Sequence, residues 1–493
     1  MGFLRAFLFV ISFCIAACEQ GALNPSNTEL VEFDSASAAL PGGEGSTAFL
    51  PFPSYDKPFA NLPENARADF YAGKALAEQP WIKAPTTTTA RDGLGPIYNA
   101  RTCLSCHIRG GRGRMPDSGG ELRQGIVRLS LSPQASEQHA NSLSLLGVIP
   151  EPTYGDQLQT QSVSLAHQLR QKAAKTEFSK TDVPPEAYVK IVWHERNFSY
   201  PDGATANLRK PLIELTNQGY GELHQDTRFS LRNAPPIHGM GLLERIPQSS
   251  IDSIADPQDN NRDGISGRVN QVWDVEAKQT RPGRFGLKAN RPSLAMAVAG
   301  AFANDVGISN PLFSESPCTP KQTRCLQQAN GNDAEGVELP AHLLELVVNF
   351  NRNLGVPSAR ESSENGRRAF THVGCVNCHQ PSFTTSLDPQ RPHLSQQIIW
   401  PYSDLLLHDM SEELADNRTD FTANGSEWRT PPLWGLGLSA KVNGSMHLLH
   451  DGRARSVEEA ILWHSGEGEN AKQLFTALPE ETRLALIQFV ESL

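Results

Sequence analysis

The chain has 493 residues, of which 39% are hydrophobic and 20% are charged, so it can form two or three globular domains and is neither disordered nor fibrous. Lys and Arg total 44 against 54 Asp and Glu, and the net charge of -10 argues against nucleic-acid binding. An acidic surface of this kind suits a basic protein partner.

Residues 1–17 have the features of a secretory leader. Arg5 gives a short basic region, and the apolar run after it is too short for a membrane-spanning helix. The run ends in Ile15–Cys18, which resembles a bacterial lipobox and implies cleavage before Cys18 and lipidation there; plain secretion is the alternative. Glu19 follows, which by lipoprotein sorting rules favours the periplasmic side of the outer membrane, with the lipid as the only membrane contact.

Residues 18–60 are rich in Ser, Gly, Pro and Ala and show no hydrophobic period, so we expect a flexible tether. A first domain with insertions is predicted over 61–357. Its insertion alternates short β-like runs, such as Gly125–Leu131 and Ala187–Trp193, with polar loops.

Two short motifs carry most of the functional signal. Each reads C-x-x-C-H, in which two thiols can form thioethers to the vinyl groups of one haem and the adjoining histidine can bind its iron. A disulfide or zinc pair beside an incidental histidine is the alternative. The residues are Cys103, Cys106 and His107 in the first motif and Cys375, Cys378 and His379 in the second.

The first motif is followed by a basic, glycine-rich segment, Arg109–Arg114, which could hold the haem propionates or form a solvated loop. Further on, Arg232–Leu242 and Arg429–Leu438 share an R…PP..G.GL pattern, which suggests two related haem domains in tandem. The turns could lie against a haem or be purely structural. His238 and Met240, in the first turn, could also bind the first iron.

Asp259, Asn261 and Asp263 fit the first half of a calcium-binding loop, with oxygen ligands at alternate positions before a glycine. The twelfth position is Asn270 rather than Glu, so a complete EF-hand is not present. A calcium site and a surface turn rich in Asp and Asn both remain open.

Cys318 and Cys325 lie close together in a polar stretch and are predicted to form a disulfide, which implies an oxidising compartment. A C-terminal cytochrome c domain is predicted over 358–493, because a helix, the second motif and a final amphipathic helix follow in that order. The expected fold is mainly α, with two tandem cytochrome c-like haem domains, the first enlarged by insertions with minor β structure.

The segment His450–His464 resembles the H-D-G segment of bacterial di-haem cytochrome c peroxidases. In those enzymes a methionine fourteen residues after the first histidine is the distal ligand of the C-terminal haem; here that residue is His464. The resemblance implies a second haem with His379 and His464 on its two faces and a lower potential than a Met-ligated haem, unless His464 is a surface residue. It also implies that His450, Asp451 and Arg453 support the pocket.

A wider resemblance, over about 60–493, is to the bacterial di-haem oxidoreductase family of peroxidase-like proteins, often labelled thiol oxidoreductases. Besides the segments above, it rests on Gly93–Pro96, Ala234–Pro236, Ile265–Arg268 and Gly283–Gly286. The resemblance implies two covalently bound c-type haems and an activity inferred from the peroxidases.

If His464 occupies the remaining coordination position of the second iron, peroxide or oxygen chemistry must take place at the first haem. That chemistry needs an acid/base group there. Three glutamates are candidates: Glu244, Glu195 and Glu121. Trp434 and Trp463 could carry electrons between the haems or only fill the core.

Three functions remain open. The first is a haem-dependent enzyme that takes electrons from a small cytochrome or cupredoxin and reduces peroxide or another small oxidant. The second is a non-catalytic di-haem electron carrier. The third is a di-haem oxygenase or protein-maturing oxidase.

Overall fold

The computed structural model describes residues 34–88, 91–132, 139–164 and 182–493. Asp34–Leu493 form one compact unit. The leader, Cys18 and Glu19 lie outside the described residues, so the predicted lipidation stays a prediction. Within the described ranges, none of the helices has the length and apolar character needed to cross a membrane.

Helices account for 31% of the structure and strands for 19%, so the expectation of a mainly α fold underestimates the β content. The α-helices are α1 (Ser35–Ala38), α2 (Glu64–Glu78), α3 (Cys103–Cys106), α4 (Ala140–Leu146), α6 (Met240–Arg245), α7 (Gln248–Asp252), α8 (Leu294–Ala301), α9 (Thr323–Leu326), α10 (Ala341–Arg352), α11 (Glu364–His372), α12 (Ser411–Leu414), α13 (Ser439–Asn443), α14 (Val457–Leu462), α15 (Glu469–Ala477) and α16 (Glu480–Ser492). Shorter or irregular turns of helix are η1 (Gly43–Gly45), η2 (Ile108–Gly110), η4 (Phe302–Val306), η5 (Cys375–Asn377), η6 (Pro392–Leu394), η7 (Leu436–Leu438) and η8 (Gly466–Gly468).

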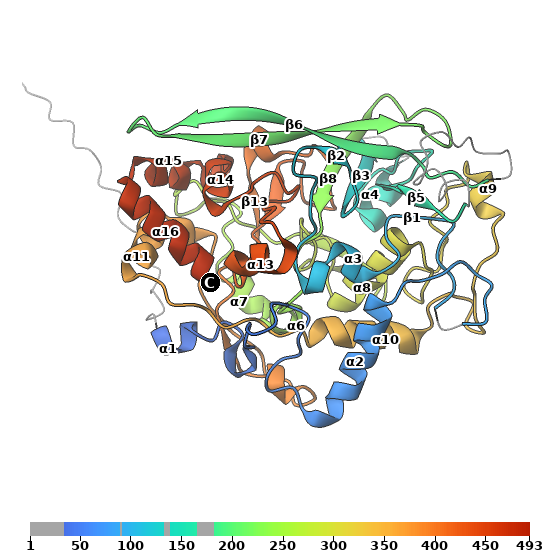
Figure 1. Cartoon of the computed structure of the whole chain (residues 1–493), viewed down its shortest axis with the longest axis horizontal. Coiled ribbons are helices and arrows are strands. Elements are labelled where there is room, and N and C mark those ends of the chain that lie inside the picture. Colours follow the sequence, from blue (N-terminus) through green and yellow to red (C-terminus); the bar gives the residue numbers. More distant parts are fainter. Residues whose placement is uncertain (1–33, 89–90, 133–138, 165–181) are drawn as a thin grey trace, which may run out of the picture. The chain divides into compact units, whose positions relative to one another are not determined.

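The strands pair into small antiparallel sheets of two or three strands. A long hairpin of β6 and β7, paired from Tyr188 with Thr216 to Ser199 with Thr205, runs along the top of Figure 1. The strands are β1 (Ile97–Tyr98), β2 (Gly120–Glu121), β3 (Gly125–Leu131), β4 (Gln157–Leu158), β5 (Gln161–Ser162), β6 (Tyr188–Ser199), β7 (Thr205–Thr216), β8 (Thr227–Asn233), β9 (Gln271–Asp274), β10 (Gln279–Pro282), β11 (Phe383–Thr384), β12 (Ile398–Ile399), β13 (Leu407–Asp409) and β14 (Glu427–Arg429). The predicted β runs 125–131 and 187–193 fall on β3 and β6.

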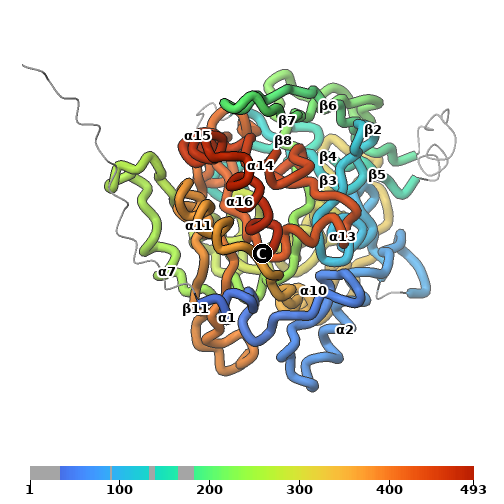
Figure 2. The backbone as a smooth tube through the Cα atoms, turned by 60° about the vertical axis from the view of Figure 1, so that its left-hand side comes forward, coloured from blue at the N-terminus to red at the C-terminus, as the bar shows by residue number. Residues whose placement is uncertain are grey.

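Each haem motif is preceded by a helix that crosses a later helix at a glycine. On α2, a Cβ added to Gly73 would lie 1.9 Å from the carbonyl oxygen of Leu346 on α10. On α11, a Cβ added to Gly366 would lie 2.1 Å from the carbonyl oxygen of Ala485 on α16. Figures 1 and 2 show these two helix pairs in separate parts of the unit. The two crossings are alike, and each brings the helix before a C-x-x-C-H motif against a helix later in the chain.

Residues 34–60 do not form the flexible tether that their composition suggests. Tyr55 and Phe59 are 2% and 1% exposed, and the backbone N–H of Thr47 donates to the carbonyl oxygen of Val356 at 2.8 Å. Although this segment is rich in Ser and Gly, it includes a few large apolar side chains. Their burial holds the segment on the domain.

Cys318 and Cys325 are joined by a disulfide, as the sequence predicts. The bridge closes a short loop that begins before α9 and ends within it. Both cysteines are buried there, beside Ile97 and Val183.

Candidate haem-binding site

One continuous cavity brings together the two C-x-x-C-H motifs and His464. Its wall includes the cysteines and histidine of both motifs and the histidine from the C-terminal segment: Cys103, Cys106, His107, Cys375, Cys378, His379 and His464. The two motifs are far apart in sequence, so only the tertiary fold places them on one wall.

His107 is held with one ring nitrogen free. The helix of the first motif, α3, begins at the cap residue Thr102, whose hydroxyl accepts a hydrogen bond from the N–H of Ser105 at 2.9 Å. The Nδ1 of His107 lies 2.7 Å from the carbonyl oxygen of Pro235, and because a carbonyl can only accept, Nδ1 carries the proton. Burial lowers the pKa of His107, so the ring is neutral and its Nε2 can bind a metal.

His379 has the same arrangement with a different partner. Its Nδ1 donates to the carbonyl oxygen of Tyr402 at 2.9 Å. Burial lowers the pKa of His379 to about 4, against the opposing effect of that hydrogen bond. The second proline turn, with Pro431 and Pro432, also lines the cavity but does not supply this carbonyl.

His464 lies one residue beyond the last turn of α14, and its Nδ1 donates to the carbonyl oxygen of Ala460 at 2.8 Å. Burial lowers the pKa of His464, which leaves a neutral ring with a free Nε2. The pKa of His379 is also lowered by His464, because the charged forms of the two rings would repel each other, so the two imidazoles lie near one another. Both rings lie on the wall of the same cavity.

The four motif cysteines are free thiols, and each residue is half-buried. Burial raises the pKa of Cys103, Cys106 and Cys375 to about 12, and raises that of Cys378 as well. Neutral thiols that are not joined in disulfides suit thioether formation better than thiolate coordination of zinc.

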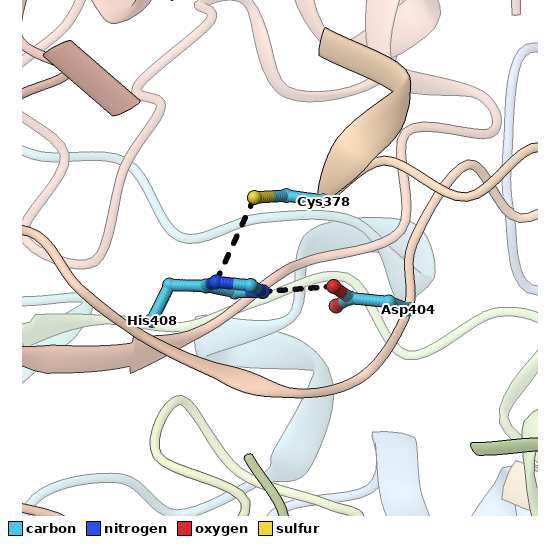
Figure 3. Close-up of side chains that lie close together, drawn as sticks. All are labelled: Cys378, Asp404 and His408. Carbon is cyan, nitrogen blue, oxygen red and sulfur yellow. Dashed lines mark hydrogen bonds and ion pairs between the residues drawn. The ribbon is translucent and has the colours of Figure 1, made fainter. Parts of the chain in front are cut away.

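Cys378 lies in a second cluster, shown in Figure 3, with Asp404 and His408. Burial alone would lower the pKa of His408, but Asp404 at 2.8 Å from Nε2 outweighs it, and the pKa is raised well above its ordinary value. Its Nδ1 lies 2.6 Å from an oxygen of Glu467 and 3.6 Å from the sulfur of Cys378. Both ring nitrogens of this imidazolium donate, so neither can bind a metal ion.

The cavity wall carries more positive than negative charge. The cations are Arg112, Arg128, Arg232, Arg284, Arg291, Arg429 and Lys472, and the carboxylates are Asp263, Asp305 and Glu467. Arg112 is only 8% exposed and its Nε has no hydrogen-bond partner. Burial lowers the pKa of Arg112 to about 10, so it stays cationic and fits an anionic group such as a haem propionate.

The other two arginines of the same basic segment point elsewhere. Arg109 reaches the carbonyl oxygen of Pro53 at 3.5 Å, and Arg114 pairs with Asp117 at 2.8 Å on the surface. Of the segment Arg109–Arg114, which could hold the haem propionates, only Arg112 lines the cavity.

The three candidate glutamates lie away from the cavity wall. Glu244 caps α8 through the N–H of Leu294 at 3.0 Å and pairs with Arg352 at 3.1 Å. Glu195 is exposed on β6, and Glu121 pairs with Arg123 at 2.9 Å on the surface. The sequence prediction of these acid/base groups is therefore wrong, because charge type alone does not show which side chains face inward.

His238 is also absent from the cavity wall, whereas Met240 lines it. The Nε2 of His238 lies 3.2 Å from the carbonyl oxygen of Trp434, and its ring stacks on Tyr55 with centroids 4.3 Å apart. His238 is therefore a packing residue between the two proline turns rather than an iron ligand.

His450 lines the cavity, with Asp451 and Arg453 behind it in an ion pair of 2.7 Å. The His450 ring stacks on Trp428 with centroids 3.8 Å apart. Trp428 and Trp434 line the cavity, but Trp463 is buried behind it under Arg453. Nothing in the sequence indicates that Trp428 lies at the site, apart from its position next to Arg429.

In the predicted calcium loop, the polar atoms bond to one another. The amide oxygen of Asn261 accepts from the N–H of Asp263 at 2.9 Å, and Asp259 accepts from the N–H of Gly264 at 3.3 Å. Among the described residues, Asp259 and Asp263 belong to no group of three His, Cys, Asp or Glu side chains close enough to hold a metal ion. The calcium site therefore stays a prediction.

A family model described as "Di-haem oxidoreductase, putative peroxidase" matches residues 38–493. No curated protein is significantly similar. Among solved structures, hydrazine synthase from Kuenenia stuttgartiensis is 15% identical, with a TM-score of 0.22, over 36% of this chain and 63% of that one. The chain thus spans less than two thirds of that structure, and the low TM-score gives no support for a shared fold.

Proposed function

The chain belongs to the di-haem oxidoreductase family, and from this we infer that it is a periplasm-facing, peroxidase-like oxidoreductase with two c-type haems. The single observation that carries the inference is the common state of three histidines. His107, His379 and His464 each give Nδ1–H to a backbone carbonyl and leave Nε2 free on the same cavity.

In this proposal, Cys103 and Cys106 hold one haem and Cys375 and Cys378 hold the other. The haems supply one-electron transfer and the reduction of a bound oxidant. His379 and His464 would hold the second haem, which would exchange electrons. His107 would hold the first haem, which would supply the chemistry on the oxidant.

The surroundings of each site support this division of roles. His464 is half-buried with a lowered pKa and lies near His379, which suits a second ligand to the same haem. The described histidines on the cavity wall are His107, His379, His408, His450 and His464, and His238 is engaged with Trp434 instead. Trp428, stacked on His450 in the cavity wall, lies on the same surface as both motifs and suits electron transfer between them.

Two further features support a location outside the cytoplasm. The Cys318–Cys325 disulfide is suited to an oxidising compartment. The leader and its lipobox-like end at Cys18 suit a lipid anchor on the outer membrane. The net charge of -10 suits a basic electron-donor protein, such as a small cytochrome or cupredoxin.

The test is the full chain produced with a working cytochrome c maturation system. We expect a mass increased by two haems, and a resting EPR spectrum with one high-spin and one low-spin haem. Reduced protein should be oxidised by hydrogen peroxide with two electrons per peroxide. Two low-spin haems that stay unreactive toward peroxide after partial reduction would indicate an electron carrier, and reaction with oxygen but not peroxide would indicate an oxygenase.

A further inference from the structure

The segment of α14 that leads to His464 has one face on the cavity and one face outside it. The cavity face consists of residues that recur at intervals of three and four: Val457, Ala460, Ile461 and His464. Glu459 and Trp463 are four residues apart on the other face and are buried outside the cavity wall. The position of α14 therefore decides how His464 enters the cavity.

His464 differs from the two motif histidines in what holds its ring. The rings of His107 and His379 donate to carbonyl oxygens of segments far away in the chain. The Nδ1 of His464 instead donates to the carbonyl oxygen of Ala460, in its own helix, at 2.8 Å. Because this hydrogen bond moves with the helix, the ring keeps its place only if α14 does.

The β6–β7 hairpin holds α14 through Glu459, and Figure 1 shows the hairpin beside this helix. One carboxylate oxygen of Glu459 accepts from the backbone N–H of Arg209 on β7 at 3.0 Å. The other accepts from Nε of Arg455 at 2.9 Å, and Arg455 also donates to the carbonyl oxygen of Asn207 on β7 at 2.9 Å. Glu459 is only 4% exposed, so these hydrogen bonds lie where the low dielectric strengthens them.

The tip of the hairpin holds the first turn of the same helix. The hydroxyl of Tyr200, a buried residue, donates to a carboxylate oxygen of Glu458 at 2.7 Å. Arg483 of α16 lies over the ring of Tyr200, 4.3 Å from its centre, and pairs with Asp202 at 2.7 Å. The tip is thereby fixed against two helices near the C-terminus, α14 and α16.

A third contact lies directly beside His464. Two guanidinium groups lie over the ring of Trp463, that of Arg196 on β6 at 4.7 Å and that of Arg453 at 4.5 Å from the ring centre. A cation over an aromatic ring contributes more when the contact is shielded from water, and Trp463 is buried. Arg196 thus holds the residue that precedes His464.

The hairpin can support α14 because its other contacts fix it to the rest of the unit. The indole N–H of Trp193 donates to the carbonyl oxygen of Pro116 at 2.7 Å, and β6 pairs with β2. The side chain of Arg209 lies over the ring of Trp193 and donates to the carbonyl oxygen of Asp117 at 2.7 Å. Arg209 therefore joins α14, through its backbone, to the segment after the first motif, through its side chain.

We propose that the β6–β7 hairpin positions His464, acting through Arg196, Tyr200 and Arg209. The inference rests on the proposed function, in which His464 would be the second ligand of the second haem. The three hairpin residues do not line the cavity, so they act on the imidazole only through the helix that carries it. Their role is to keep that imidazole directed into the cavity.

The test is carbon monoxide binding to the reduced holoprotein. Carbon monoxide needs an open position on ferrous iron, so at the second haem it can bind no faster than His464 leaves. The wild type should therefore show a slow phase at that haem, and His464→Ala should convert it to a fast phase. These two results together show that the slow phase measures the departure of His464.

Two conservative variants each remove one contact between the hairpin and α14. Tyr200→Phe loses the hydrogen bond to Glu458, and Glu459→Gln loses the ion pair with Arg455. Each should speed the slow phase by about 10-fold, the scale of one hydrogen bond to a charged group.

Arg196 allows a test by rescue, and its side chain is half exposed, so its replacement leaves the core intact. Arg196→Ala should speed the slow phase by about 3-fold, the scale of a weak cation–π contact. Arg196→Lys keeps a cation over Trp463 and should restore much of the wild-type rate. Lys190→Ala is the matched control, because Lys190 pairs with Glu214 within the same hairpin at 3.2 Å, and it should leave the rate unchanged.

If Tyr200→Phe, Glu459→Gln and Arg196→Ala all keep the wild-type slow phase while His464→Ala abolishes it, the hairpin does not position His464 and the proposed function stands. If His464→Ala leaves the slow phase unchanged, His464 is not the ligand, and the assignment of the second haem fails together with this inference. Should Tyr200→Phe or Glu459→Gln not take up haem, the two Arg196 variants decide the question.

Discussion

His238 and Trp434 occupy the same position in two copies of one proline turn, and the Nε2 of His238 lies 3.2 Å from the carbonyl oxygen of Trp434. The glycine after each, Gly239 and Gly435, has a positive φ of 74° and 71° and begins a helical turn. The repeat in the sequence is therefore a repeat in space, and the two copies meet face to face. This contact joins the turn that holds His107, through the carbonyl of Pro235, to the second turn.

The contact predicts a large effect of Gly239→Ala. The new Cβ would lie 2.4 Å from the ring of Trp434, and the residue would also need a positive φ. We expect the free energy of unfolding to fall by about 2–4 kcal/mol, from backbone strain together with overpacking. Urea unfolding followed by tryptophan fluorescence measures it.

Gly203→Ala is the matched control, because Gly203 has φ 88° but nothing within 4 Å of an added Cβ. It should lose only about 1–2 kcal/mol from the backbone. If both variants lost the same free energy of unfolding, the contact between the turns would contribute nothing to stability.

Replacing His464 tests the second haem directly. In His464→Ala the second iron should lose one axial ligand, and its low-spin EPR signal should become high-spin. His464→Met should keep it low-spin and raise its reduction potential, because a thioether favours Fe(II) more than imidazole does. His194→Ala, on β6 and away from the cavity, serves as the control. An unchanged spectrum in His464→Ala would rule out this ligand.

Arg112→Gln should lower the reduction potential of one haem by tens of millivolts. A buried positive charge near a haem favours the reduced state, and at about 8 Å with an effective dielectric constant of about 20 its effect is about 2 kcal/mol. Arg114→Gln, in the same basic segment but at the surface, should change the potential far less. Potentiometric titration of both variants makes the comparison, and equal shifts would place Arg112 away from the propionates.

The stability contributed by His408 should depend on pH with a definite sign. The pKa of His408 in the folded protein is raised well above the ordinary value of 6.5. The stabilisation from its ion pair with Asp404 is therefore fully present below pH 6.5. The contribution is lost as the pH rises through the folded pKa. On the acid side the relevant group is Glu467, whose pKa in the folded protein is lowered. Its contribution to stability is therefore fully present above its ordinary pKa of 4.5 and disappears as the pH falls through the folded value.

We therefore expect His408→Gln to lose about 3–5 kcal/mol near pH 6, as removal of one partner from a buried ion pair does. The difference from wild type should shrink as the pH is raised above neutrality. Urea unfolding of both proteins across this range measures it. A difference that stays constant with pH would mean that His408 is neutral in the folded protein.

The sequence by itself predicted how this protein would attach its haems. Two thioethers and a proximal histidine must come from one short stretch of chain, so C-x-x-C-H records them locally, and the family resemblance adds His464 at a fixed distance from His450. Only the tertiary structure decided what surrounds those groups: the carbonyls of Pro235 and Tyr402 beside the motif histidines, Arg112 rather than Arg109 on the cavity wall, and none of the three candidate glutamates there. Burial, and the hydrogen bonds and charges that depend on it, comes from segments distant in the chain, so local composition could not reveal it, as the packing of residues 34–60 also shows.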